Sequence, residues 1–205
     1  TKRGKSGNAS WNFSTRQGTN WLSNPEGRSG MLYGFNTTTT QIDSVNLYRH
    51  EAAEGKGPIF TNGALQGYSL SVAGGSDATK YFTSLNYDND VGVVPWNTAK
   101  KLGARANLDL LIGNKLKITT SVGYLRNRVR LAQGAIDVDP FSNLVWGTPL
   151  TLDKGQRGFT RSPPEEWSTV QSHADGDRTT TSLTLNYTPI SWVTNRLVTG
   201  LDASS

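Results

Sequence analysis

The sequence predicts an all-β protein that forms part of an antiparallel transmembrane β-barrel. Three observations lead to this fold class: long segments of strict apolar–polar alternation, connections that are alternately tight and long, and no run of about 18 apolar residues such as a transmembrane helix needs. Mean hydropathy is −0.49, and 35% of the 205 residues are hydrophobic. These averages fit a barrel, because transmembrane strands direct half of their side chains toward a polar lumen.

The alternation is clearest in three consecutive segments, 65–75, 80–94 and 101–112. A period of two indicates a strand with one apolar face and one wet face. Each segment keeps the pattern for about ten residues, which is longer than most strands and is the length that a tilted strand needs to cross a bilayer. These segments therefore predict membrane-spanning strands joined as hairpins.

Further strands are expected at 8–18, 115–129 and 177–188, with a last one beginning at Arg196. Two long connections, 19–63 and 130–176, alternate with short turns at 75–78, 113–114 and 189–195, while 88–95 is intermediate. Residues 42–53, in the first long connection, are a candidate short helix. Short turns on one side and long loops on the other are typical of outer-membrane barrels, and we expect the long loops on the extracellular side.

The parity of the apolar positions assigns each strand a lipid face and a lumen face. The lipid face is expected to carry Leu70, Val72, Leu85, Leu108, Leu110, Ile118, Val122, Leu183 and Leu185. The lumen face is expected to carry Arg105, Asn107, Asp109, Lys117, Thr119, Ser182, Thr184 and Asn186. Aromatic residues expected near strand ends, at the level of the lipid headgroups, are Trp11, Tyr81, Tyr87, Tyr124, Tyr187 and Trp192.

Composition and motifs give no indication of catalysis or of a cofactor. The chain has no cysteine, which excludes disulfides, thiolate metal sites and cysteine nucleophiles. Its net charge of +5 comes from scattered lysines and arginines, so nucleic-acid binding is not expected. The segment Gly4-Lys5-Ser6 precedes a strand pattern and not the helix that a phosphate-binding loop opens. We predict no catalytic, cofactor-binding or metal-binding residue, and the chain is not expected to be an enzyme.

Two polar segments resemble metal sites only superficially. The stretch His50–Glu54 looks like a helical zinc motif with its second histidine replaced, but the other histidine, His173, is far away in the chain. The runs Asp88–Asp90 and Asp137/Asp139 lack the spacing of a calcium loop. Surface and loop carboxylates are the simpler interpretation of both.

Aromatic residues in or beside the long connections are the candidate ligand-contacting residues. They are Trp96, Phe141, Trp146, Phe159 and Trp167. Such rings can stack on sugars or peptides at the mouth of a barrel. They can equally close a compact surface loop on itself, and the sequence favours neither interpretation.

Four short motifs, in order, resemble the SusC/RagA-type TonB-dependent outer-membrane transporters. The N-terminal stretch 1–7 is similar to the end of that family's plug domain, where T-K-[KR]-G-K leads into the first barrel strand. Residues 68–82 resemble its second hairpin, residues 87–95 its Y-x-x-x-x-G-I-V-P loop, and residues 105–109 its R-x-N-L-D strand. The likeness covers about 1–16 and 65–130, and extends more loosely to Trp192.

This resemblance implies that the chain is the N-terminal part of a plugged barrel of about 22 strands, with its first six or seven strands present. Residues 1–7 would be the end of the plug, and 8–205 a partial barrel with extracellular loops at about 19–63 and 130–176. The intact protein would import oligosaccharides, peptides or similar nutrients across the bacterial outer membrane. Its partners would be a SusD-like surface lipoprotein, outer-membrane lipids, and TonB, ExbB and ExbD acting through parts absent from this chain.

Two alternatives stay open at the level of sequence. A soluble β-sandwich that binds carbohydrate predicts strands buried on both faces. A passive porin-like barrel predicts no plug before Thr1. The start at Thr1 and the alternating segment that stops near Ala203 suggest an internal fragment of a longer protein.

Overall fold

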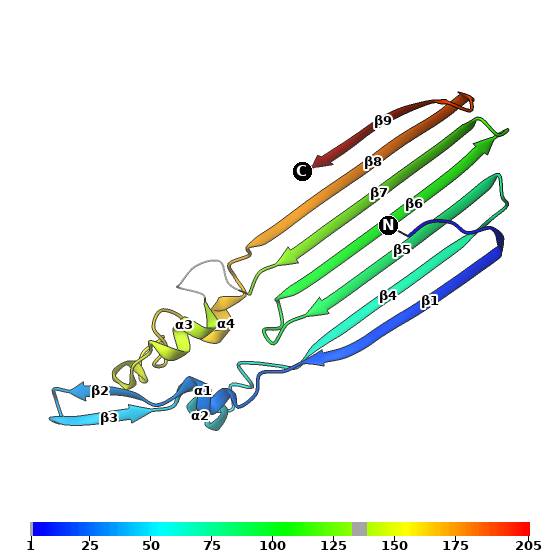
Figure 1. Cartoon of the computed structure of the whole chain (residues 1–205). Coiled ribbons are helices and arrows are strands. Elements are labelled where there is room, and N and C mark those ends of the chain that lie inside the picture. Colours follow the sequence, from blue (N-terminus) through cyan, green and yellow to red (C-terminus); the bar gives the residue numbers. More distant parts are fainter. Residues whose placement is uncertain (1, 133–138) are drawn as a thin grey trace.

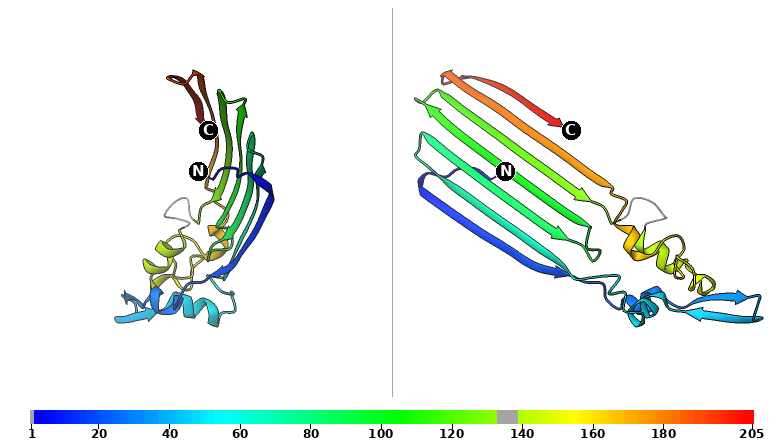
Figure 2. Two further views of the ribbon diagram at one scale, coloured as in Figure 1. Left: turned by 45° about the vertical axis from the view of Figure 1, so that its right-hand side comes forward. Right: turned by 180° about the vertical axis from the view of Figure 1, so that it is seen from behind.

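Seven long antiparallel strands form one curved sheet in the computed structural model, which describes residues 2–132 and 139–205 (Figures 1 and 2). Neighbouring strands in the sheet follow one another in the chain, apart from two short strands that lie within the first long connection. None of the described helices is long and apolar enough to cross a membrane. The sheet strands are β1 (Gly7–Asn20), β4 (Gly63–Gly75), β5 (Thr79–Val91), β6 (Thr98–Ile112), β7 (Leu116–Arg130), β8 (His173–Ile190) and β9 (Val193–Ser204).

The predicted strands and the alternation of connection lengths are confirmed. The largest differences in length are at β8, which begins four residues earlier than the alternation indicated, and at β5, which ends at Val91 rather than Val94. β8 begins early because its first residues, from His173, complete the ladder with β7, where Arg130 pairs with His173. The mixed residues Ala174–Gly176 break the alternation that sequence reading relies on.

The strand register gathers the predicted apolar side chains on one face. Residues directly opposite one another in a ladder share a face, and one such row crosses the sheet through Phe13, Leu70, Leu85, Ala104, Tyr124 and Thr179. Leu85 in this row is 50% exposed although it lies in the middle of the sheet. A wide, exposed and apolar sheet face is expected where lipid is the solvent.

The apolar band has the height of a bilayer core. Along β6 it extends from Leu102 to Ile112, about 33 Å at about 3.3 Å per residue. At a strand tilt of about 40° this corresponds to about 25 Å along the membrane normal, the height of the apolar band of outer-membrane barrels. Tyr87 and Tyr124 lie toward the long-loop end of this band and Tyr187 near the other end, whereas Trp11 and Tyr81 lie deeper in the band than the sequence indicated.

The first long connection contains α1 (Pro25–Ser29), a hairpin of β2 (Leu32–Asn36) and β3 (Gln41–Val45), and α2 (Leu47–Ala53). The helix predicted over 42–53 is therefore wrong in its first half, because Gln41–Val45 pairs with β2 across a turn at 37–40. Asn46 separates the two elements, since its side chain accepts the Arg49 N–H and caps α2. The second long connection holds α3 (Pro140–Val145), a 3₁₀ turn η2 (Pro149–Thr151) and α4 (Pro164–Trp167).

Apart from Phe82 of β5, the buried hydrophobic residues of the described chain lie in the connections, where they form one cluster. Its buried members are Val45, Leu47, Ile59, Phe60, Val94, Leu144, Phe159 and Trp167. Residues 21–62, 92–97, 131–132 and 139–172 thus form one folded body, which we call the loop unit. It lies beyond one end of the sheet, and the β2–β3 hairpin projects furthest from the strands (Figures 1 and 2).

Candidate functional site

The polar face of the sheet carries a broad depression of about 670 Å³. Its lining includes Asn86, Arg105, Arg178 and Thr180, which come from β5, β6 and β8. Arg178 is paired with Asp202 on β9, whereas Arg105 has no ion pair among the described residues. The depression can therefore offer a free guanidinium and several neutral hydrogen-bonding groups to a polar ligand or to another part of the protein.

The N-terminal segment, residues 2–7, returns across this polar face (Figure 1). The Asn107 side-chain amide donates to the Lys2 carbonyl at 2.6 Å, and Arg3 lies 3.6 Å from the Asp109 carboxylate. At the start of β1, the Ser6 hydroxyl donates to Asp77 at 2.6 Å. Asn107 and Asp109, which the alternation assigned to the lumen face, therefore hold a chain segment against that face.

Gly4 makes the closest approach of this segment to the sheet. A Cβ atom at this position would lie 2.4 Å from the Tyr81 backbone nitrogen and 2.6 Å from its carbonyl oxygen. Backbone atoms within a sheet cannot move aside, so only glycine fits here. The glycine of the N-terminal motif thus has a direct structural role.

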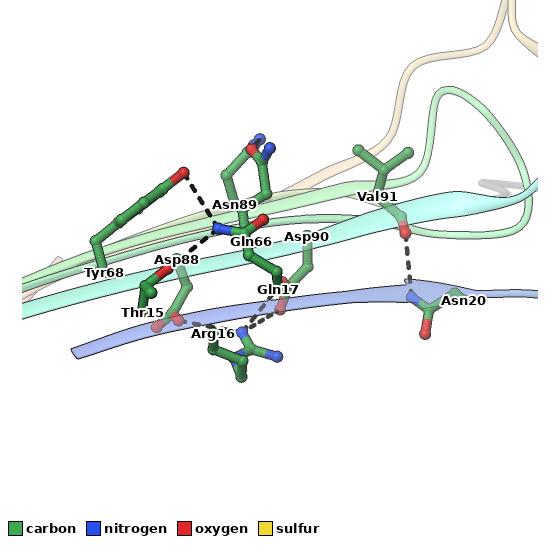
Figure 3. Close-up of polar contacts among 10 residues, drawn as sticks. All are labelled: Thr15, Arg16, Gln17, Asn20, Gln66, Tyr68, Asp88, Asn89, Asp90 and Val91. Atoms are coloured by element: carbon green, nitrogen blue, oxygen red, sulfur yellow. Dashed lines mark hydrogen bonds and ion pairs between the residues drawn. The ribbon is translucent and has the colours of Figure 1, made fainter.

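A charged cluster joins β1 to β5 on the same face, near the loop unit. Arg16 contacts both Asp88 and Asp90 at 3.1 Å, and it reaches them across Gly67 of β4 (Figure 3). These two carboxylates, considered above as calcium ligands, are therefore paired with an arginine. On the opposite side of the ribbon in Figure 3, the Gln17 side-chain amide donates to the hydroxyls of Thr15 and Tyr68.

An arginine connects the two long connections within the loop unit. Arg157 contacts Glu51 of α2 at 2.9 Å and Glu165 of α4 at 2.5 Å, and Glu51 is only 1% exposed. The Arg157 guanidinium lowers the pKa of the Glu165 carboxyl to about 2, and the two carboxylates raise the pKa of Arg157. Glu51 belonged to the zinc-like stretch, and its pairing with Arg157 shows a structural role. No group of three potential metal ligands occurs in the part of the chain that the structure describes.

The five candidate aromatic residues all belong to the loop unit, but they differ in exposure. Phe159 and Trp167 are 1% exposed and meet edge to face, with 5.4 Å between ring centroids. They close the loops on themselves and present no surface to a ligand. Trp96 is partly buried, and its indole N–H donates to the Ala132 carbonyl. Phe141 and Trp146 are 46% and 62% exposed and remain accessible.

Sequence reading missed one exposed apolar surface. On the β2–β3 hairpin, Tyr33, Phe35 and Ile42 point to the same side and are 59–70% exposed. The signal was the short alternation Leu32–Asn36, which is followed by four threonines and a second short segment. It was hidden by the Asn-, Gly- and Thr-rich composition around it.

Comparison with known proteins agrees with this geometry. No family model matches the chain. The TonB-dependent receptor P26 of Formosa agariphila is 40% identical over 55 residues, which cover 27% of this chain and 6% of that receptor. The structure of the RagAB peptide importer in its closed-closed state superposes on the whole chain with a TM-score of 0.68 at 14% identity, and the structure in its open-open state gives 0.65 at 15%.

This chain has the fold of a segment of the RagAB transporter barrel. The segment spans 28–29% of the RagAB chains that it matches. Its fold confirms the antiparallel transmembrane barrel predicted from the alternation. The relatives of this barrel segment are receptors and importers, and not enzymes.

Proposed function

We propose that the chain is part of an importer in the bacterial outer membrane that depends on TonB. The observation that carries this proposal concerns the two faces of the sheet. One face is apolar and exposed, and the other is polar and binds residues 2–7 through Asn107 and Asp109. An apolar outer band fits lipid, and a chain segment held in the lumen fits the junction between a plug and its barrel. The RagAB structures, whose fold the chain shares, are described as a peptide importer.

The domain organisation that we propose rests on this placement of residues 2–7. Residues 1–7 are the end of a plug, and 8–205 are a partial barrel whose long connections, 19–63 and 130–176, face the outside of the cell. Since the sheet is a single layer, its architecture does not support a soluble sandwich. The N-terminal segment, residues 2–7, is bound to the polar face of the sheet, and this favours a plugged barrel over a passive porin.

Peptides, oligosaccharides or similar nutrients are the substrate class, and the exposed rings of Phe141 and Trp146 are the best candidates for contact with them. Trp96 contributes from a partly buried position, while Phe159 and Trp167 support the shape of the loop unit. A SusD-like surface lipoprotein would cover the loop side, and TonB with ExbB and ExbD would supply the energy through parts of the protein outside this chain.

Uptake by the full-length protein tests the proposal. Cells that carry it are given labelled peptide and oligosaccharide pools, with and without a functional TonB. We expect uptake of one pool that stops when TonB is deleted and weakens in the Trp146→Ala variant. Uptake of the same extent without TonB would show a passive pore and would contradict the proposal.

A further inference from the structure

The lipid-facing surface of the sheet carries charge at one end only. In β1 and β4 to β9, the outward positions of the apolar band are uncharged, from Ile112 and Leu116 at the short-turn end to Leu102 and Tyr124. Charged side chains begin where the strands approach the loop unit. They are Lys100, Arg126, Arg128 and Arg130 on β6 and β7, with Asp175 and Asp177 opposite them on β8.

Two of these cations face each other directly. The register pairs Lys100 with Arg128, and like charges in this position repel each other unless an anion lies between them. Asp177 contacts Arg126 at 3.0 Å and Arg128 at 2.9 Å, and Asp175 is 3.6 Å from Arg128. Both carboxylates lie on the β8 side, so they do not separate Lys100 from Arg128.

Lys100 has no anionic partner among the described residues. On its other side the register places Asn89, whose amide donates to Gln66. Lys100 itself is exposed. Arg126 contacts Asp177 through Nε, which leaves its terminal nitrogens without a carboxylate. Arg130 is directed elsewhere, since it donates to the Ser168 carbonyl of the loop unit.

The cations lie at the height where lipid headgroups begin. Tyr124 is the next outward residue of β7 toward the apolar band. Its hydroxyl donates to Asp177 at 3.0 Å, and its ring lies in the same cross-strand row as Leu85 and Ala104. Tyrosine rings commonly mark this boundary in membrane barrels. A lipid whose phosphate binds here can lay its acyl chains against the apolar band. A soluble anion has no acyl chains and gains no such contact.

We propose that Lys100, Arg126 and Arg128 bind the phosphate group of a membrane lipid on the outside of the barrel. The phosphate would lie between Lys100 and Arg128 and supply the missing negative charge, with the fork of Arg126 as a further donor. This site is separate from the lumen and from the transported ligand. It requires only that the apolar face lie in a membrane.

The test uses the full-length protein in nanodiscs of phosphatidylcholine, alone or doped with phosphatidic acid. Lys100→Gln removes the unpaired cation, and Lys101→Gln is the matched control, because it removes the same charge from the adjacent residue on the lumen face. Thermal unfolding midpoints are measured, and retained phosphatidic acid is counted by native mass spectrometry.

We expect phosphatidic acid to raise the midpoint of the wild type and of Lys101→Gln, and to raise that of Lys100→Gln much less. Retention by Lys100→Gln should fall about fivefold, the factor expected for one basic residue at an anionic membrane surface. In phosphatidylcholine alone, Lys100→Gln should be as stable as the wild type or more so, because the repulsion from Arg128 is gone.

Equal responses of the wild type and Lys100→Gln to phosphatidic acid would overturn the proposal. Inorganic phosphate is the second probe: if it stabilises the wild type in phosphatidylcholine as much as phosphatidic acid does, the ligand is a soluble anion and the lipid assignment is wrong. TonB-dependent uptake by Lys100→Gln is measured in parallel and should be unchanged. Failure of the lipid site is thereby distinguished from failure of the transport proposal.

Discussion

Gly4 lies closer to the backbone of β5 than any side chain would permit. Gly4→Ala should therefore push residues 2–7 away from the lumen face, at a cost of about 1–3 kcal/mol typical of overpacking. The expected result in the full-length protein is a lower thermal unfolding midpoint and faster tryptic cleavage after Lys5. Gly155→Ala is the control, because a Cβ there would meet open space. Equal cleavage rates in the two variants would show that the segment does not depend on this contact.

Leu108 lies in the middle of the apolar band, where its outward neighbours are Tyr81 and Thr120. Leu108→Arg should hinder membrane assembly, since an arginine facing lipid near the midplane costs about 2–4 kcal/mol. Leu111→Arg is the control in the same strand, because Leu111 has the opposite parity and faces the lumen. The amount of heat-modifiable, folded barrel in outer-membrane fractions measures the difference. Normal assembly of Leu108→Arg would contradict the assignment of this face to lipid.

The loop unit, at the scale of elements, depends on Arg157. Arg157→Gln would leave the buried carboxylate of Glu51 without its partner, and breaking a buried pair in this way costs about 3–5 kcal/mol. We expect protease sensitivity to increase in the loops while the strands stay folded. Arg49→Gln is the control, since the Arg49–Glu26 pair is exposed and such pairs contribute little. Equal proteolysis of both variants would argue against a structural role for the pair.

The same cluster predicts a dependence on pH. The folded pKa of Glu165 is about 2, below its ordinary value of 4.5, because it pairs with Arg157. A carboxyl with a lowered pKa stabilises the fold above its unfolded pKa, and this contribution is lost as the pH falls from about 4.5 toward 2. Glu165→Gln should flatten the pH dependence of loop stability in that interval, as measured by proteolysis with an acid-active protease. An unchanged profile would show that other carboxyls dominate.

The seven-stranded sheet, at the scale of the whole molecule, has two unpaired edges, β1 and β9. Long edge strands with an exposed apolar face are prone to pair with other copies. The 205-residue chain expressed alone should therefore form oligomers or aggregates in detergent, as seen by size-exclusion chromatography, whereas the full-length protein should remain monodisperse. A monomeric, folded isolated chain would mean that the edges are protected in a way that the strand order does not indicate.

The sheet could be predicted from sequence because its signal is local and repeated. In β6 every second residue from Leu102 to Leu110 is apolar, and the ladder places all of them on one face. The loop unit could not be predicted in the same way. Glu51 and Arg157 are separated by 106 positions, and nothing near either residue identifies the other. Trp146 and Trp167 look alike in the sequence, yet one is 62% exposed and the other 1%, because burial depends on which chain segments meet.

The position of the hydrophobic core bears on the order of folding. The contact of Glu51 with Arg157 joins two segments that are separated in the sequence by β4 to β7. The hairpins of the sheet, by contrast, join strands that are neighbours in the chain. Loop closure over long stretches is slow, so we expect the hairpins to form first and the loop unit to close last. Pulse-labelled hydrogen exchange during assembly would then show strand amides protected before those of α2 and α4. The loop unit would in that case fold last and stabilise the register of strands that have already paired.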